Sequence, residues 1–301
     1  MFTQRHKLSI SKVCLLLGVT RMSYYRNKWR KSRYENKATE VLRMVEKIRM
    51  EMPRIGTRKL HHMLKENLNA IGVGRDRLFA ILKANHMLIQ PRRSYRTTTD
   101  SRHRFRKHRN LIARMEISRP EQVWVADITY IGGRDRHMYL ALITDAYSKK
   151  IVGYDLSSSL DTSGSLRALD MAHRSRLYPS LPLIHHSDRG LQYCSDHYQD
   201  RLRKYEIITS MTETHDPYAN AVAERVNGIL KQEFYLEEMD FNLETMQKMV
   251  KDCIRTYNTL RPHFSCGYLT PAQMHDQSKR KLKTYKKKLD NEGMPSLSNS
   301  I

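Results

Sequence analysis

The sequence predicts an α/β domain that is preceded by an all-helical region and followed by a basic tail. From Gln122 onward, runs of β-branched and aromatic residues at hairpin spacing predict strands, and an alternation of helices and strands follows them. Ahead of residue 90, apolar residues recur at helical spacing instead. We therefore divide the 301 residues into a helical region (1–90), a basic linker (91–120), an α/β core (121–277) and a basic tail (278–301).

The helical region contains two short helical hairpins. In "LSISKVCLLLGVTRMSYYRNKW" an apolar helical stripe is followed by Gly18 at a turn position and by Thr20 as an N-cap. A second pair of helices is expected at 57–67 and 75–85, on either side of a glycine-containing loop. Short helix, turn, helix is the outline of a helix-turn-helix. Two hairpins that only pack against each other are the alternative interpretation.

The charge balance points to a polyanionic partner. There are 54 Lys and Arg residues against 31 Asp and Glu residues, a formal net charge of +23, which favours nucleic acid over an anionic membrane. Composition alone also suits a ribosomal or chaperone-like protein. The linker can follow a phosphate backbone or be a solvated connector. The candidate DNA contacts in these regions are Arg21, Tyr24, Arg26, Arg75, Arg77, Arg92 and Arg93.

Neither a zinc site nor a membrane span is expected. The four cysteines are scattered and form no C-x-x-C pair, which disfavours both a disulfide framework and a cysteine-based zinc site. No apolar run approaches the roughly 18 residues that cross a bilayer. We expect a soluble, intracellular protein.

The predicted strands and helices of the core follow a recognisable order. Three antiparallel-type strands, "QVWVADITYI", "MYLALITDAYS" and "IVGYDLSSS", come first. Helices and strands then alternate: a helix at 162–176, a strand in "LPLIHHSD", a helix at 196–205, a strand in "IITSM", and helices at 220–234 and 243–260. This is the order of an RNase-H-like α/β fold.

Three carboxylates stand where a metal-dependent reaction would need them. Asp127 lies among apolar residues in a strand, where a lone acid is costly unless it is paired or binds a metal. Asp188 ends a strand, and Glu224 sits in a helix among small residues. Such a set can converge on two Mg²⁺ ions about 3.5–4 Å apart, with Mn²⁺ as a substitute, and support in-line displacement at phosphorus.

Each of these acids also has a structural interpretation. Asp127 could be a hydrogen-bonded strand residue, Asp188 a turn former and Glu224 a surface helix acid. Other acids lie nearby, and spacing alone does not exclude Asp145. The remaining neighbours of this kind are Asp155 and Asp216.

At these residues the sequence resembles the transposases of the IS-three family of bacterial insertion sequences, within the DDE superfamily of retroviral integrases. The matching segments include "VWVADITYI", "HHSDRGLQYCSDHY", "NAVAERVNGILKQEF" and "YNTLRPHFSCGYLTPAQ", and together they cover about residues 121–273. Asp188 and Glu224 have the family's own spacing, with 35 residues between them. The helical region resembles the family's DNA-binding segments.

The resemblance implies that Asp127, Asp188 and Glu224 bind the metal ions of a transposase that nicks element ends to a 3′-hydroxyl and then joins that hydroxyl to target DNA. Lys231, on the same helix face as Glu224, would be a cation beside the scissile strand or an exposed lysine. Arg189 would shape the loop of the second acid, and Asn220 would cap the Glu224 helix while facing DNA. The implied setting is the bacterial cytoplasm, on nucleoid DNA.

Two departures from the family pattern define the alternatives. Ala219 stands where many relatives have an acid, and no sustained heptads appear near the start of the chain. The resemblance implies that an upstream reading frame, with a helix-turn-helix and a leucine zipper, is commonly joined to a frame like this one. An upstream-frame polypeptide of the same element is therefore an expected partner, together with double-stranded DNA and further copies of this chain. One alternative function is a catalytically inactive DNA-binding regulator derived from a transposase. A second is an RNase-H-like nuclease that acts on RNA–DNA hybrids. The roles of Tyr257, Asn258, Arg261 and His263, structural or DNA-contacting, are left open by the sequence.

Overall fold

The computed structural model describes residues 9–90, 108–113, 115–133, 137–212 and 221–276. The basic tail and most of the basic linker lie outside the described residues. So do four residues singled out from the sequence, namely Arg92, Arg93, Asp216 and Asn220.

The chain begins with the predicted helix, turn and helix. Helix α2 (Ile10–Leu16) is followed by Gly18 with a φ of +64°, and Thr20 accepts a hydrogen bond from the Ser23 amide at the start of α3 (Arg21–Glu51). The expectation of a short second helix is wrong, because α3 runs for 31 residues. No glycine or proline interrupts it, and Pro53 comes two residues after its last residue, Glu51.

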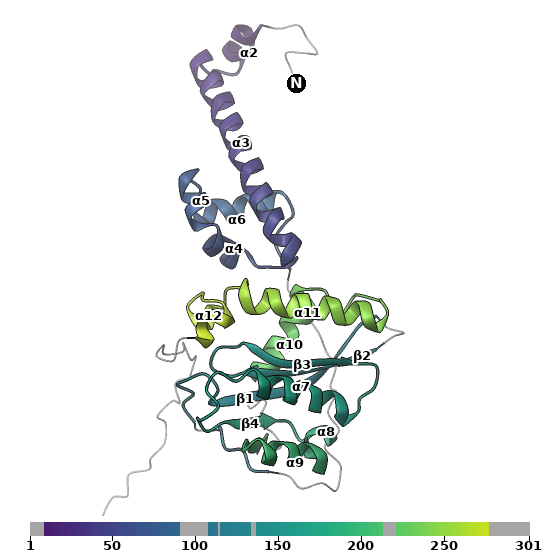
Figure 1. The fold of residues 1–301 in the computed structure, drawn as a ribbon. Helices are drawn as coiled ribbons and strands as arrows, with labels where there is room; N and C mark the ends of the chain where they lie inside the picture. Colours follow the sequence, from purple (N-terminus) through teal and green to yellow (C-terminus); the bar gives the residue numbers. More distant parts are fainter. Residues whose placement is uncertain (1–8, 91–107, 114, 134–136, 213–220, 277–301) are drawn as a thin grey trace, which may run out of the picture.

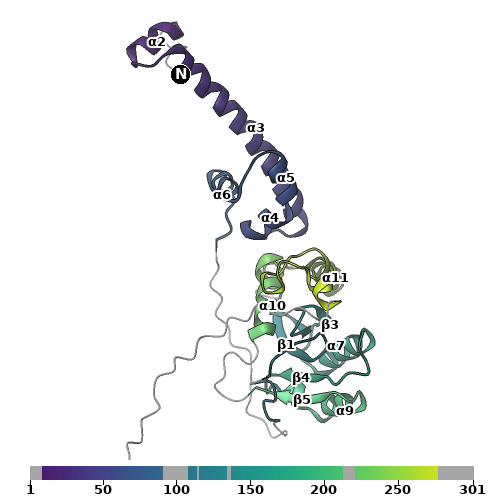
Figure 2. The same cartoon turned by 90° about the vertical axis from the view of Figure 1, so that its left-hand side faces the viewer.

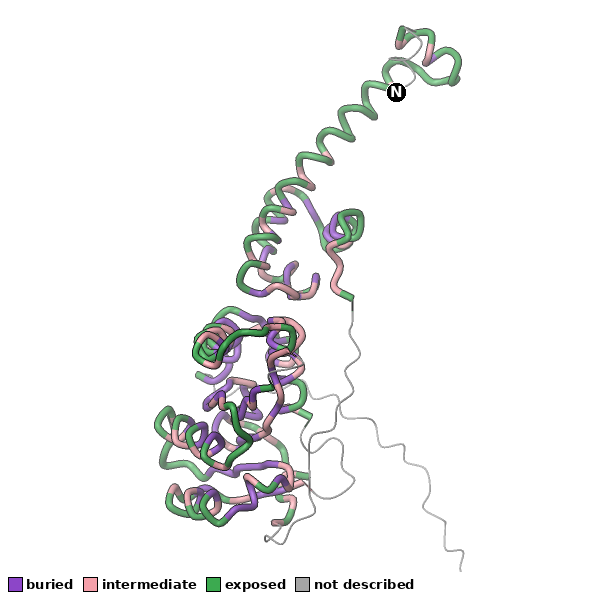
Figure 3. The backbone as a smooth tube through the Cα atoms, turned by 90° about the vertical axis from the view of Figure 1, so that its right-hand side faces the viewer, coloured by how far each residue is buried: buried purple, intermediate pink, exposed green. Residues whose placement is uncertain are grey.

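Within the described residues, α3 is packed along its second half and, at its start, contacts α2. Helices α4 (Thr57–Met63), α5 (Lys65–Ala70) and α6 (Arg75–Ala84) bury their apolar faces against it, around Val41 and Val45. The predicted single helix over 57–67 is two helices that meet at Leu64. The first half of α3 extends away from this bundle and is exposed along most of its length (Figure 3). We call α2–α6, residues 9–90, the helical unit.

The core contains a five-stranded sheet in the order β3-β2-β1-β4-β5. Strands β1 (Val123–Ile131), β2 (Met138–Asp145) and β3 (Ile151–Ser157) form an antiparallel meander. Strand β4 (Ile184–Ser187) pairs with β1 in parallel, and β5 (Ile208–Met211) pairs with β4 in parallel. This mixed sheet with flanking helices confirms the predicted RNase-H-like α/β class.

Helices cover both faces of the sheet (Figures 1 and 2). Helices α7 (Thr162–Arg174), α8 (Leu191–Cys194) and α9 (Asp196–Lys204) pack on one face. Helices α10 (Ala221–Glu233) and α11 (Leu243–Thr259) pack on the other, followed by a 3-10 turn (Phe264–Cys266) and α12 (Pro271–His275).

Side chains of β1 alternate between the two faces. Trp124 and Ala126 pack with the α7 and α9 side, whereas Val123 and Val125 pack against Ala223 of α10. Asp127 is next in the second series. The alternation therefore directs its carboxylate toward α10.

Candidate active site

The strand register brings Asp127 and Asp188 next to each other. In the parallel pairing of β1 with β4, Ala126 lies opposite Ser187, so the next residue on each strand is an aspartate. Asp188 comes immediately after β4, where the chain leaves the sheet, and both aspartates are half-buried. Two acids 61 residues apart in sequence thus occupy the same edge of the sheet.

Helix α10 carries the third acid toward this edge. Glu224 lies in the first turn of α10 and is exposed. One turn later, the side-chain amide of Asn227 donates a hydrogen bond of 2.7 Å to Oδ2 of Asp127. Residues three apart share a helix face, so the bond from Asn227 holds the face that carries Glu224 against Asp127.

The charges of these acids interact. The pKa of Asp127 is raised to about 7, chiefly by burial and then by the charge of Asp188, with a smaller contribution from Glu224. Hydrogen bonds from the Ile128 amide and from Asn227 act in the opposite direction. A carboxylate with so few donors and two acidic neighbours is stabilised by a cation.

The donor set fits a hard divalent cation. All three side chains offer carboxylate oxygens, the ligands that such ions prefer. Within the described ranges, no group of three or more His, Cys, Asp or Glu side chains is arranged to hold a metal ion as the structure stands. The relief of the charge at Asp127 is the local reason for a cation to bind here.

The loop after β4 is shaped around Asp188. The Gly190 amide donates to Oδ1 of Asp188 at 3.0 Å, and a Cβ added at Gly190 would lie 2.9 Å from that same oxygen. A residue with a side chain at this position would therefore displace the carboxylate. Arg189, between them, is half-buried.

The other acids considered from the sequence have structural partners. Oδ1 of Asp145 accepts 2.7 Å hydrogen bonds from the amide and the hydroxyl of Ser148, and Oδ2 accepts one of 2.7 Å from the Glu121 amide. Asp155 accepts two 2.8 Å hydrogen bonds from the Arg167 guanidinium. Both carboxylates therefore serve the fold and lie outside the group formed by Asp127, Asp188 and Glu224.

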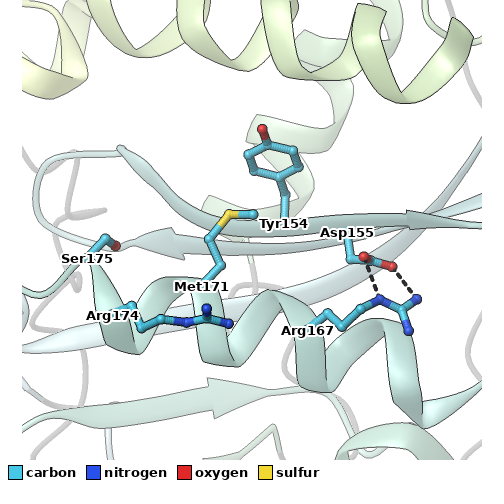
Figure 4. A pocket seen from close by; sticks show the side chains of 6 residues that line it. All are labelled: Tyr154, Asp155, Arg167, Met171, Arg174 and Ser175. Atoms are coloured by element: carbon cyan, nitrogen blue, oxygen red, sulfur yellow. Dashed lines mark hydrogen bonds and ion pairs between the residues drawn. The ribbon is translucent and has the colours of Figure 1, made fainter. Parts of the chain in front are cut away.

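Asp155 also lines an open cavity of about 450 Å³ between β3 and α7 (Figure 4). Its other lining residues are Tyr154, Arg167, Met171, Arg174 and Ser175. Strand β3 is the edge strand on the far side of β2 from β1. The cavity is thus separate from the site at β1 and β4.

The candidate DNA-contact residues are distributed over the molecule. Arg21, Tyr24 and Arg26 are exposed on the projecting part of α3. Lys231 is half-buried in the last turn of α10, two turns after Glu224.

Two arginines of α6 have contacts within the helical unit. Arg75 forms a 2.9 Å ion pair with Asp76, and the Arg77 guanidinium lies 5.1 Å from the ring centre of Tyr34 on α3. Arg77 thus contributes to the packing of α6 on α3, a role that the sequence pattern did not indicate.

The late motif, whose role the sequence left open, supports the fold. Asn258 accepts a hydrogen bond from the Ile151 amide and donates one to the Ile151 carbonyl, which holds the start of β3. The Tyr257 hydroxyl donates to the Lys149 carbonyl. Arg261, with 1% of its side chain exposed, pairs with Glu233 of α10, and His263 is buried beside the Tyr257 hydroxyl.

Asn227 is the site residue that the sequence reading missed. Its spacing of three residues from Glu224 was the available signal, because that spacing puts both side chains on one helix face. An asparagine at a helix surface has many uses, however, and only the packing of α10 on β1 identifies Asp127 as its partner.

Comparisons with known proteins find similarity to integrase core domains and to proteins of bacterial insertion elements. Models of the integrase core domain match residues 117–217 and 205–271. An uncharacterized 31 kDa protein of insertion element IS600 from Shigella sonnei is 34% identical over 269 residues, which cover 88% of this chain and 98% of that protein. Transposase InsF for insertion sequence IS3fB of Escherichia coli K12 is 28% identical over 284 residues, 92% of this chain and 98% of InsF.

A solved structure of the HTLV-2 integrase catalytic core domain in complex with magnesium matches with a TM-score of 0.42 and 20% identity, over 56% of this chain and 99% of that one. In the described part of the chain, no helix is both long enough and apolar enough to cross a membrane.

Proposed function

The chain belongs to the IS-three family of insertion-sequence transposases, and from that premise we propose that Asp127, Asp188 and Glu224 are the metal-binding acids with which it cuts and joins DNA. As a member of this family it is a DDE polynucleotidyl transferase and its partner is DNA. The observation that carries the assignment is the register of β1 with β4, which sets Asp188 beside Asp127, with the face of α10 held there by Asn227.

We propose two Mg²⁺ ions as the cofactors, with Mn²⁺ as a substitute. When bound, such ions activate an attacking oxygen and stabilise the oxygen that leaves phosphorus. The chain's own contribution is to bring three carboxylates together and to orient them. Asn227 fixes the Asp127 carboxylate through Oδ2, and the Gly190 amide fixes Asp188 through Oδ1.

The reaction we propose has two steps of one chemical type. Water first attacks a phosphodiester at an element end, which releases a 3′-hydroxyl. That hydroxyl then attacks a phosphodiester of target DNA, so that one P–O bond forms as another breaks. The proposed site of action is the cytoplasm, on nucleoid DNA.

The proposed assembly includes more than one chain. We propose that Arg21, Tyr24 and Arg26 on the projecting part of α3 contact element-end DNA. The further proposed DNA contacts are Arg75, Arg77, Arg189, Lys231, Arg92, Arg93 and Asn220. We further propose that copies of the chain and the upstream-frame polypeptide assemble on DNA. Exposed apolar side chains at Leu15, Leu16 and Trp29 support a protein partner near α2 and α3.

The test is strand cleavage and transfer on labelled duplexes from the element's ends, with Mg²⁺ or Mn²⁺. We expect metal-dependent products from the wild type and from Glu237→Gln, which removes an exposed acid beyond α10, and none from Glu224→Gln. Equal products from Glu224→Gln would overturn the assignment of the third acid.

A DNA-binding regulator is the alternative outcome of the same experiment. It would bind the duplexes and yield no products with either metal. Addition of the upstream-frame polypeptide then separates an incomplete enzyme, which gains activity, from a regulator, which does not.

A further inference from the structure

The helical unit is joined to the core at the end of α10 opposite Glu224. The Arg54 amide donates a 3.1 Å hydrogen bond to the Glu233 carbonyl, and the Arg54 guanidinium lies 5.7 Å from the ring centre of Tyr235. The rings of His62 and Tyr268 stack with their centres 4.5 Å apart. The apolar side chains buried in the helical unit and those under α10 and α11 belong to one continuous cluster.

A cluster of three charged side chains lies at the centre of this joint. Glu233 accepts two 2.8 Å hydrogen bonds from the Arg261 guanidinium of the core and one of 3.1 Å from Nζ of Lys59 on α4. The Lys59 and Glu233 side chains are each 17% exposed, and that of Arg261 is 1% exposed. We call these three residues the joint cluster.

The two cations of the joint cluster have different roles. Arg261 and Glu233 belong to the core and form a complete bidentate pair, which Arg261 needs because an unpaired buried charge is costly. Lys59 is the contribution of the helical unit. Burial and repulsion from Arg261 lower its pKa to about 8, and the attraction of Glu233 opposes this. Burial therefore disfavours the charged lysine, and the 3.1 Å hydrogen bond to Glu233 is the contact that keeps the ammonium paired while the helical unit lies against the core.

Glu233 and Glu224 share one rigid helix, nine residues apart. Because the helical unit contacts Glu233, its position relative to Glu224 on the same helix is also fixed. A helical unit that binds DNA would deliver the duplex at a defined place along α10. Strand cleavage depends on such placement, because a shift of about 1 Å can cost on the order of a hundredfold in rate.

We propose that Lys59 is a positioning residue, which seats the DNA-binding helical unit on Glu233 and thereby aligns the scissile strand with the Glu224 end of α10. This inference rests on the proposed function. It assigns Lys59 no contact with the reacting atoms.

The test compares Lys59→Glu with Lys65→Glu in the full-length chain. Both variants change the charge of the helical unit equally, but Lys65 is exposed on α5, whereas a glutamate at position 59 would face Glu233 in a mostly buried place. We expect Lys59→Glu to lose amide-exchange protection in α4 and in the last turn of α10, while α6 and β1 stay protected. Lys59→Met, which removes the charge without repulsion, should show a smaller loss.

The functional readout separates binding from cleavage. We expect Lys59→Glu to bind element-end duplex as tightly as Lys65→Glu does, and to cut it at the correct phosphate at least about tenfold more slowly, with products at neighbouring phosphates. Correct cleavage at the rate of Lys65→Glu would overturn the proposal, as would unchanged exchange in α4 and α10. A wild type that cuts nothing even after addition of the upstream-frame polypeptide would contradict the proposed function instead, and the exchange data would still decide whether Lys59 holds the joint.

Discussion

Two groups of acidic side chains lie beside the sheet, and they differ in how many hydrogen bonds their carboxylate oxygens accept. The first, which we call the anchor cluster, consists of Glu121, Asp145, Ser148 and His275. The His275 ring lies between the two acids, with Nε2 3.5 Å from Glu121 and Nδ1 3.7 Å from Asp145. Although burial favours the neutral acid, the nearby His275 ring and hydrogen bonds from the amides of Leu177 and Tyr178 lower the pKa of Glu121 to about 2.

The second group is formed by Asp127, Asp188 and Glu224. In this group the pKa of the buried acid, Asp127, is raised rather than lowered. Burial and the two neighbouring acids raise the pKa of Asp127 to about 7, and within the described ranges two donors, the Ile128 amide and Asn227, oppose this. Satisfied carboxylates hold the fold together, whereas crowded carboxylates with few donors store electrostatic energy that a cation releases. This difference separates Asp145 from Asp127, which the sequence alone did not.

The largest expected effect is on catalysis. Asp188→Asn keeps the shape of the side chain but removes a charge that a metal needs, so we expect cleavage to fall on the order of a thousandfold or more. DNA binding should stay within about twofold, because the phosphate contacts that dominate affinity remain. Asp196→Asn, at an exposed acid of α9, should cleave normally. Normal cleavage by Asp188→Asn would place the metal elsewhere.

The second effect is on stability. In Asp145→Asn, an NH₂ group would replace an oxygen that accepts from Glu121 or from Ser148, so that two donors face each other. We expect a loss of about 3 kcal/mol in the free energy of unfolding, measured by urea denaturation. Cleavage per folded molecule should remain unchanged. A variant that folds normally but does not cleave would move Asp145 into the catalytic group.

A third effect should fall on the orientation of Asp127. Asn227→Ala removes the 2.7 Å hydrogen bond to Oδ2 and should slow cleavage about 10–100-fold, as the loss of a residue that orients a metal ligand does. The exposed Asn69 of α5 supplies the matched control, Asn69→Ala. Wild-type rates from both variants would show that Asp127 needs no support from α10.

The smallest effect concerns pH and metal. The pKa of Asp127 is raised from 3.8 to about 7, so its contribution to stability in metal-free protein is present below the unfolded value and is lost as the pH rises through about 7. Added Mg²⁺ should therefore raise the melting temperature by a few degrees at pH 8, corresponding to about 1–3 kcal/mol, and by less at pH 5.5. Asp127→Asn should abolish the difference between the two pH values. Equal shifts at both would argue against Asp127 as a ligand.

Local patterns sufficed for most of the elements. Each of the five strands was expected within a few residues of its place, because alternating and β-branched runs act over short distances. The length of α3 was misjudged, since the turn chemistry at Gly18 and Thr20 marks where the helix starts but nothing before Pro53 marks its end. The helix predicted over 57–67 is interrupted at Leu64, and nothing in the apolar pattern marks that position.

By itself, the sequence determined the fold class and the basic character and singled out three candidate acids, because strand and helix periodicity, net charge and motif spacing are written along the chain. Tertiary structure alone decided which residues meet. It paired Asp127 with Asn227, enclosed Asp145 in the anchor cluster, made Arg261 a partner of Glu233 and brought Lys59 to the same carboxylate. These contacts depend on the register of β1 with β4 and on the packing of α10, which are set by the burial of side chains far apart in sequence.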